Sequence, residues 1–280
     1  MKLFAFANQK GGVGKTTLAV HMAIHAHNMG FRVLLVDLDQ QGSSTFLLTG
    51  DGERHQTDKS TALDLWYPDR GIPVQPSPIF GFDFLQASAA LDAVDGSDSM
   101  TTQSAVMALR RLELLDYHLV VVDCPPAPGV RQIAPLLVAD KAVAPVTPDL
   151  LGTQGLVALV QTYTTMIRPV NPKLELRVLI NRLKANSSRN HTIAEELANG
   201  FSDIVSPWWL FDREDVRTGL LHGKPHWEVC RDEAQRNAWY QAFDSLLQDV
   251  PNDEDEPGSQ EVAEPEDAED LLDAGPRGAA

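Results

Sequence analysis

Short apolar runs alternate with longer stretches of helical character along most of this chain. The apolar runs are rich in Val, Leu and Phe, which predicts buried strands at residues 2–7, 31–39, 82–87, 118–123, 141–146 and 174–180. Helical spacing, or the absence of Gly and Pro, predicts helices at residues 18–29, 101–115, 156–166, 188–199 and 231–247. This alternation indicates an α/β fold of three layers, a mostly parallel twisted sheet flanked by helices.

A glycine-rich segment, NQKGGVGKTT at residues 8–17, stands between the first strand and the first helix. Strand, glycine loop and helix form the context of the phosphate-binding pattern GxxxxGK[ST], although its first position here is not glycine. Backbone N–H groups from Gly11, Gly12, Val13 and Gly14 can approach phosphate oxygens, and the helix N-terminus favours the same anion. In this pattern the lysine, Lys15, reaches the β- and γ-phosphates.

The two threonines after that lysine complete the predicted site. Thr16 would bind Mg²⁺, and Thr17 could donate to the α-phosphate. A glycine turn that binds nothing is the alternative, which the agreement of strand, loop, Lys-Thr pair and helix disfavours.

A second lysine, Lys10, stands at the start of the loop. The segment resembles the deviant Walker A loop, KGGxGK[ST], of the ParA/MinD ATPases. The resemblance implies a P-loop NTPase that uses ATP and Mg²⁺ and forms a homodimer when ATP is bound. It also implies that Lys10 reaches across the dimer interface to the nucleotide of the other subunit.

Two aspartates end the second predicted strand, in the order Asp37-Leu-Asp39-Gln-Gln-Gly. This run is similar to the family pattern DxDxQG, although Gln40 stands where ParA-like chains often have Pro. The resemblance implies that Asp39 positions or activates the attacking water. The alternative is a strand-end acid that caps a helix beginning near Ser43.

The predicted strand HLVVVD ends in Asp123 and is followed by Cys124 and two prolines. This is the form of a Walker B strand, whose acid holds Mg²⁺ directly or through water, and it also resembles the DxPP run of the family. A nucleophilic role for Cys124 lacks a partner histidine, so we predict a buried structural thiol.

Polar residues elsewhere leave alternatives open. Asn181 follows a predicted strand, and the resemblance implies contact with the adenine base, whereas an Asn bonded to its own backbone is equally compatible. His21 and His25 lie four residues apart and could chelate a metal. Because no third ligand is evident, we favour polar helix histidines.

Charge and composition divide the chain of 280 residues, whose net charge is −16. Residues 251–280 hold eleven acids and one arginine, so they carry −10 and leave −6 for the rest. We predict an acidic disordered tail at 251–280 and a ParA-like P-loop ATPase domain at 1–250. The N-terminus lacks a signal-peptide pattern, no apolar run reaches about 18 residues, and the acidic end is not a basic amphipathic membrane anchor. We therefore expect a cytoplasmic protein without a stable membrane anchor.

A phosphate loop, a magnesium acid and a water-positioning acid predict a nucleoside triphosphatase with Lys10, Lys15 and Asp39 in catalysis. The ParA resemblance implies a nucleoid-associated dimer that binds DNA non-specifically and positions a plasmid, chromosome or large protein cargo, with hydrolysis stimulated by a ParB-like or cargo-linked adaptor. Candidate DNA contacts are the basic residues Arg177, Arg182, Lys184, Arg189, Arg213, Arg217, Lys224 and Arg231. Other possibilities are a MinD-like membrane-cycling ATPase, a metabolic P-loop ATPase and a nucleotide-dependent scaffold.

Overall fold

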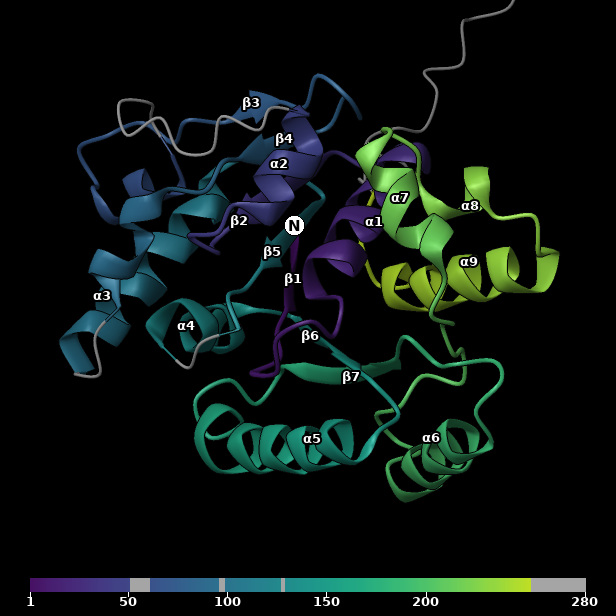
Figure 1. Ribbon diagram of the computed structural model, residues 1–280. Helices are drawn as coiled ribbons and strands as arrows, with labels where there is room; N and C mark the ends of the chain where they lie inside the picture. Colours follow the sequence, from purple (N-terminus) through teal and green to yellow (C-terminus); the bar gives the residue numbers. More distant parts are fainter. Residues whose placement is uncertain (51–60, 96–98, 127–128, 253–280) are drawn as a thin grey trace, which may run out of the picture. The chain divides into compact units, whose positions relative to one another are not determined.

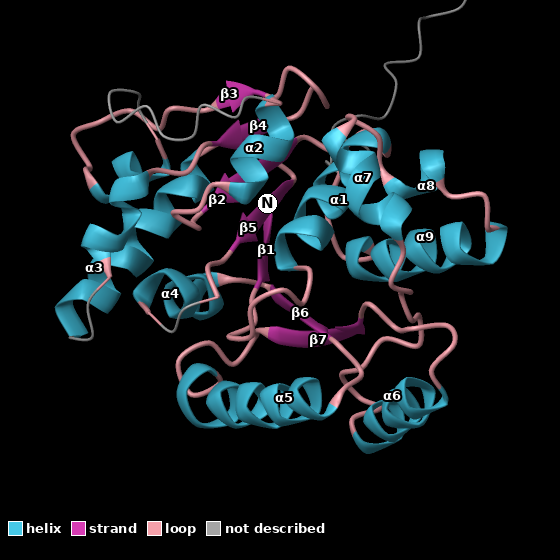
Figure 2. Ribbon diagram, in the orientation of Figure 1, coloured by secondary structure: helices cyan, strands magenta, loops and turns pink. Residues whose placement is uncertain are grey.

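Seven strands form a single sheet in the part of the chain that the structure describes (Figures 1 and 2). The computed structural model describes residues 1–50, 61–95, 99–126 and 129–252. The strand order is β3-β4-β2-β5-β1-β6-β7, with β3 antiparallel to β4 and the other pairs parallel. The strands are β1 (Lys2–Phe6), β2 (Val33–Asp37), β3 (Gln75–Pro76), β4 (Asp83–Leu85), β5 (Leu119–Asp123), β6 (Lys141–Val146) and β7 (Glu175–Ile180).

Helices cover both faces of this sheet and confirm the predicted three layers (Figure 1). One face packs against α3 (Ser99–Arg110), α4 (Val130–Val138), α5 (Leu150–Thr162) and α6 (Ser188–Gly200). The other packs against α1 (Lys15–Asn28), α2 (Ser43–Thr49), α7 (Glu214–Leu221), α8 (His226–Val229) and α9 (Glu233–Leu247). Short 3-10 turns η1 (Ala62–Trp66), η2 (Ala89–Val94) and η3 (Arg111–Leu114), and a π-helical turn η4 (Tyr163–Ile167), complete the elements.

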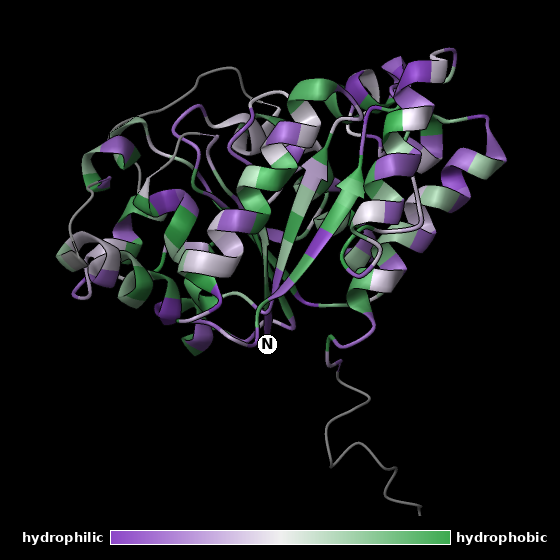
Figure 3. Cartoon of the chain, turned by 90° about the horizontal axis from the view of Figure 1, so that it is seen from below, coloured by the Kyte–Doolittle hydropathy of each residue, from purple (hydrophilic) through white to green (hydrophobic). Residues whose placement is uncertain are grey.

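Side chains alternate between the two cores along each strand, as the period of two demands. In β1, Leu3 and Ala5 belong to the core under α3–α6, whereas Phe4 and Phe6 belong to the core under α1 and α9. The strands in Figure 3 are accordingly mainly hydrophobic in colour, while the flanking helices carry both colours. Burial on both sides explains why the strands read as continuous apolar runs.

The helix predicted at residues 156–166 begins too late. Asp149 caps α5, accepting a 2.7 Å hydrogen bond from the Gly152 N–H. Gly152 resembles a helix breaker in the sequence, but a Cβ at this position would lie 1.9 Å from the carbonyl oxygen of Thr147. The glycine is therefore required by close packing between the helix start and the end of β6.

Both edges of the sheet are short or covered. The β3 edge consists of Gln75 and Pro76 alone. At the other edge, the segment at residues 204–211 lies along β7, where the Val178 N–H donates to Ile204 and the Leu210 N–H donates to Ile180.

Parallel pairing gathers the chemistry at one end of the sheet. Asp37 and Phe6 both pair with Asp123, so the segments that follow β1, β2 and β5 leave the sheet side by side. Ligands of parallel α/β sheets bind at this carboxyl edge. The compact unit Met1–Val250 contains all of these elements. The predicted disordered tail is residues 251–280, of which residues 253–280 lie outside the described part.

Candidate nucleotide-binding site

The loop between β1 and α1 has the backbone shape of a phosphate cradle. Gly12 and Gly14 adopt left-handed conformations, with φ of +74° and +98°. A Cβ on Gly11 or Gly12 would meet nothing within 4 Å, so the space beside these residues is open. A Cβ on Gly14 would lie 2.3 Å from Nδ2 of Asn181. The glycines thus serve two purposes, room for a ligand and close approach to β7.

Two consecutive residues after β7 hold this loop. Asn181 is buried, and its Nδ2 donates a 2.8 Å hydrogen bond to the carbonyl oxygen of Val13. Arg182 has a φ of 58°, and its Nη1 donates to the carbonyl oxygen of Gly12 at 2.6 Å. The Asn181 side chain therefore binds the loop rather than its own backbone. Contact with an adenine base stays a prediction.

Lys15, Thr16 and Asp123 lie together beneath the loop. Burial lowers the pKa of Lys15, and the nearby side chains of Asp123, Cys124 and Asp39 oppose this shift. Burial raises the pKa of the fully buried Asp123 to about 6, an increase that hydrogen bonds from Ser44 and Thr16 moderate. Its Oδ1 atom has no hydrogen-bond partner among the described residues. A buried carboxylate with an unused oxygen beside a hydroxyl fits the oxygen-ligand chemistry of Mg²⁺.

The two aspartates after β2 have different surroundings. Asp37 is fully buried and accepts hydrogen bonds from the Asp39 N–H at 3.1 Å and from the Thr45 N–H and hydroxyl at 2.8 Å. Burial, together with Asp123, raises the pKa of Asp37 to about 8. Asp39 lies at the cavity and accepts from the Gln41 N–H at 3.0 Å. The acid that binds the first turn of α2 is thus Asp37, and the alternative of Asp39 as its cap is wrong.

A cavity of about 450 Å³ opens above these groups, which is within the usual range for small-molecule sites. Its lining includes every residue from Gly11 to Thr17 except Val13, whose carbonyl faces Asn181. The lining residues are Gly11, Gly12, Gly14, Lys15, Thr16, Thr17, Asp39, Ser43, Phe46, Leu47, Pro126, Asn181, Arg182, Phe211, Asp212, Arg213, Val216 and Arg217.

Lys10 points into a neighbouring hollow rather than this cavity. Its Nζ lies 2.9 Å from the Thr147 hydroxyl and 3.0 Å from the nearer carboxylate oxygen of Asp149. Partial burial raises the pKa of Asp149, but hydrogen bonds from Lys10 and the Gly152 N–H outweigh it, so the net shift is downward. The ammonium group is therefore held by the segment after β6 of its own chain.

The other candidate residues have structural partners. Cys124 is buried, which raises its pKa and supports the prediction of a structural thiol. His21 and His25 are both buried, because α1 packs between the sheet and the C-terminal helices. His21 Nδ1 donates to Thr17 at 2.7 Å, and His25 Nε2 lies 2.7 Å from Asp244. They do not converge on a shared ion.

Four of the eight candidate DNA contacts are already paired with acids: Arg177 with Glu175, Arg182 and Arg217 with Asp212, and Arg213 with Asp215. Arg182, Arg213 and Arg217 also line the cavity. The remaining four are exposed and form no ion pair among the described residues; they are Lys184, Arg189, Lys224 and Arg231. Within the described ranges, the helices fall short of the length and apolar character needed to cross a bilayer.

Reasoning from the sequence missed Ser44, whose hydroxyl donates to Asp123, and the role of Arg182 in holding the loop. It also missed a group formed by Asp215, His226 and Cys230. The only signal for that group was the spacing of four between the histidine and the cysteine.

Comparison with known proteins matches residues 1–176 to a family model described as an AAA domain. The chain is 34% identical over 221 residues to the chromosome-partitioning ATPase Soj of Thermus thermophilus, covering 78% of this chain and 83% of that one. It is 29% identical over 229 residues to the sporulation initiation inhibitor protein Soj of Bacillus subtilis, covering 80% and 89%.

Solved structures share the fold. The ATP complex of a McdA variant from Cyanothece superposes with a TM-score of 0.75 at 19% identity, covering 88% of this chain and 96% of that one. Cobyrinic acid a,c-diamide synthase from Mycobacterium smegmatis, with bound ADP and magnesium, gives 0.70 at 24% identity, covering 88% and 94%.

Proposed function

Because this chain belongs to the ParA/MinD family of ATPases, we propose that it is a partitioning ATPase whose ATP-bound dimer binds DNA non-specifically and positions a plasmid, chromosome or large protein cargo. The chain is an ATP hydrolase, and its cofactors are ATP and Mg²⁺. The observation that carries the proposal is the gathering of Lys15, Thr16, Asp39 and Asp123 around one glycine loop.

Each residue of the loop has a distinct task. The amides of residues 11–14 and the N-terminus of α1 bind phosphate oxygens, and Lys15 binds the β- and γ-phosphates. Thr17 donates to the α-phosphate, and Asn181, which lines the same cavity, contacts the base. Thr16 and Asp123 would hold Mg²⁺, which would supply positive charge against the charge that develops during phosphoryl transfer. Lys15→Ala should abolish ATP binding in calorimetry, and retained micromolar affinity would refute the assignment of the loop.

Asp39 is the residue that positions the attacking water. It lines the cavity, whereas the neighbouring Asp37 is fully buried and bound to Thr45. We expect Asp39→Ala to bind ATP and dimerise but to turn over poorly. Unchanged turnover would show that another group positions the attacking water.

Lys10 acts on the nucleotide of the partner subunit. Within one chain its ammonium is bound to Thr147 and Asp149 in a separate hollow, so it does not serve the adjacent cavity. Dimerisation would exchange this ion pair for contact with a phosphate, and hydrolysis would therefore depend on assembly.

Mixing two inactive variants tests this arrangement. In a heterodimer of Lys10→Ala and Asp39→Ala, one site receives both its own Asp39 and the partner's lysine. Turnover should recover to roughly one quarter of the wild-type value, since half of the randomly formed dimers are mixed and each has one intact site. If Lys10 acted within its own chain, each subunit would lack one essential group and the mixture would stay inactive.

DNA binding would follow from the same dimer. The body of the chain is mildly acidic, so binding would use local groups, for which Lys184, Arg189, Lys224 and Arg231 have exposed side chains. An adaptor linked to the cargo would stimulate hydrolysis and release the DNA. Binding to unrelated duplexes should require ATP and weaken steeply with added salt. Binding that ignores nucleotide and salt would contradict this part of the proposal without affecting the ATPase assignment.

A further inference from the structure

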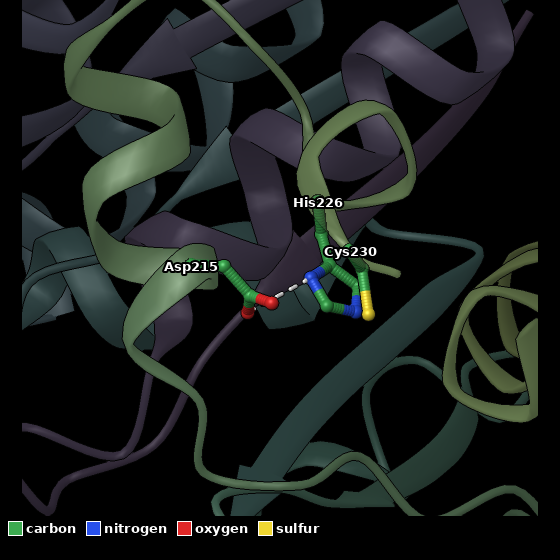
Figure 4. Close-up of side chains that lie close together, drawn as sticks. All are labelled: Asp215, His226 and Cys230. Atoms are coloured by element: carbon green, nitrogen blue, oxygen red, sulfur yellow. Dashed lines mark ion pairs between the residues drawn. The ribbon is translucent and has the colours of Figure 1, made fainter. Parts of the chain in front are cut away.

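Asp215, His226 and Cys230 form a compact group away from the phosphate loop (Figure 4). Asp215 lies in the first turn of α7, His226 begins α8, and Cys230 follows α8 directly. The three potential ligand atoms all lie within 4.8 Å of one another. In Figure 4 the carboxylate of Asp215 faces the imidazole of His226, with Oδ1 3.4 Å from Nδ1, and the sulfur of Cys230 lies beside the same ring.

The imidazole of His226 is the unusual member of this group. It is fully buried, and neither of its ring nitrogens has a hydrogen-bond partner among the described residues. A buried polar group without a partner costs about 1–3 kcal/mol. Protein side chains alone therefore leave this site incomplete.

We propose that Asp215, His226 and Cys230 bind a divalent transition-metal ion of the zinc class. Imidazole and thiolate donors select Zn²⁺ and similar ions over Mg²⁺ and Ca²⁺, which prefer oxygen. Three protein ligands with a water in the fourth position is a common arrangement for Zn²⁺. Binding replaces the thiol proton of Cys230, which is released to solvent, and the three side chains close around the ion.

The surroundings suit this assignment. Nε of Arg213 lies 3.1 Å from Oδ2 of Asp215 and would orient the carboxylate as an outer partner of a ligand. Asp215 is partly exposed and gives an ion a route of entry, whereas His226 is fully buried. This burial excludes a hydrolase triad of Cys, His and Asp, since a substrate carbonyl could not reach the cysteine–histidine pair.

The His21 side chain links this site to the start of α1, directly after the phosphate loop. The N–H of His226 donates to Nε2 of His21 at 3.0 Å, and Nδ1 of His21 donates to the carbonyl oxygen of Thr17 at 2.7 Å. An ion at His226 would therefore fasten the α7–α8 segment against the helix that begins at the nucleotide cavity.

Cobalt substitution tests the proposal on the full chain, prepared without a polyhistidine tag and without nucleotide. Titration with Co²⁺ in excess Mg²⁺ should give one equivalent per chain and a thiolate-to-cobalt charge-transfer band in the near ultraviolet. Cys230→Ser should abolish the band, and Asp215→Asn should weaken Co²⁺ affinity about tenfold or more. The matched controls are Cys124→Ser, which changes the other buried cysteine, and His222→Gln, which changes an exposed histidine of the same segment. Both should retain the band.

A second readout does not depend on the variants. Zn²⁺ should raise the thermal midpoint of the wild-type chain, and a chelator should reverse this effect. The absence of a band in the wild-type chain, or a band that persists in folded Cys230→Ser, would overturn the proposal. Because these measurements use no nucleotide, they are independent of the proposed ATPase cycle.

Discussion

Replacement of Gly14 by alanine separates the structural from the ligand-binding role of the phosphate loop. The new Cβ would lie 2.3 Å from Nδ2 of Asn181, at a residue whose φ is +98°. A left-handed alanine costs about 1–2 kcal/mol. Displacement of Asn181 breaks its buried hydrogen bond to Val13, at a further cost of about 1–3 kcal/mol. We expect a total destabilisation of roughly 2–5 kcal/mol in the absence of nucleotide.

Two neighbouring glycines provide matched controls. Gly12→Ala bears only the conformational cost, about 1–2 kcal/mol, because its Cβ meets nothing within 4 Å. Gly11→Ala has neither a clash nor a positive φ and should change stability by no more than about 0.5 kcal/mol.

Calorimetry of the nucleotide-free proteins measures the order of thermal stability of these three variants. For a domain of this size each kcal/mol lowers the thermal midpoint by about 2–4 °C, so Gly14→Ala should unfold about 4–20 °C below the wild-type chain. All three variants should lose ATP affinity, since each Cβ enters or borders the cradle. Equal midpoints for Gly14→Ala and Gly11→Ala would refute the packing of Asn181 against the loop.

Three further predictions concern titratable side chains that are buried or held in ion pairs. Burial lowers the pKa of His21 to about 3, so its contribution to the free energy of unfolding is complete above pH 6.5 and is lost as the pH falls toward 3. Denaturant titration can measure the stability difference between the wild-type chain and His21→Gln. As the pH falls from 6.5 toward 3, this difference should decrease by up to about 1.4 kcal/mol per pH unit. A difference that does not change with pH would contradict a buried neutral ring. Asp95→Ala leaves the buried Arg131 guanidinium without its 2.6 Å partner. The free energy of unfolding, measured in urea, should decrease by about 3–5 kcal/mol. A decrease below about 1 kcal/mol would mean that water reaches the arginine. Asp149→Asn weakens the hold on Lys10, so ATP-dependent dimers, measured by light scattering, should form at lower protein concentration; unchanged or weaker dimerisation would count against an exchange of partners.

The strands and the phosphate loop were predictable from the sequence, because a buried parallel strand leaves an unbroken apolar run. The run at residues 141–146 coincides with β6. Helices that contain Gly or Pro were harder to recognise. The sequence of α4 includes Pro135 and was not predicted, and α5 begins at Leu150 because Asp149 caps it.

Side-chain partners were the least predictable part of the site. Lys15 and Asp123 followed from local patterns, because Lys15 belongs to the glycine loop and Asp123 ends the apolar run HLVVVD before two prolines. The hydrogen bonds from Asn181 and Arg182 to the loop join residues that are 168 and 170 positions apart. No local sequence pattern indicates contacts over such separations. His21 was predicted only as a polar helix histidine, because the sequence does not reveal that α9 and the segment before it cover α1.

The covered edges of the sheet limit how two copies can associate. The edge strand β3 has only two residues and ends in Pro76, so it offers few backbone groups for pairing with another chain. At the other edge, the segment at 204–211 already pairs with backbone groups of Val178 and Ile180 in β7. In the described part of the molecule, growth of one continuous sheet across two protomers is therefore blocked. The proposed dimer would instead meet through side chains, which dissociate more readily than a shared β-ladder and would suit an assembly that forms and separates in every cycle.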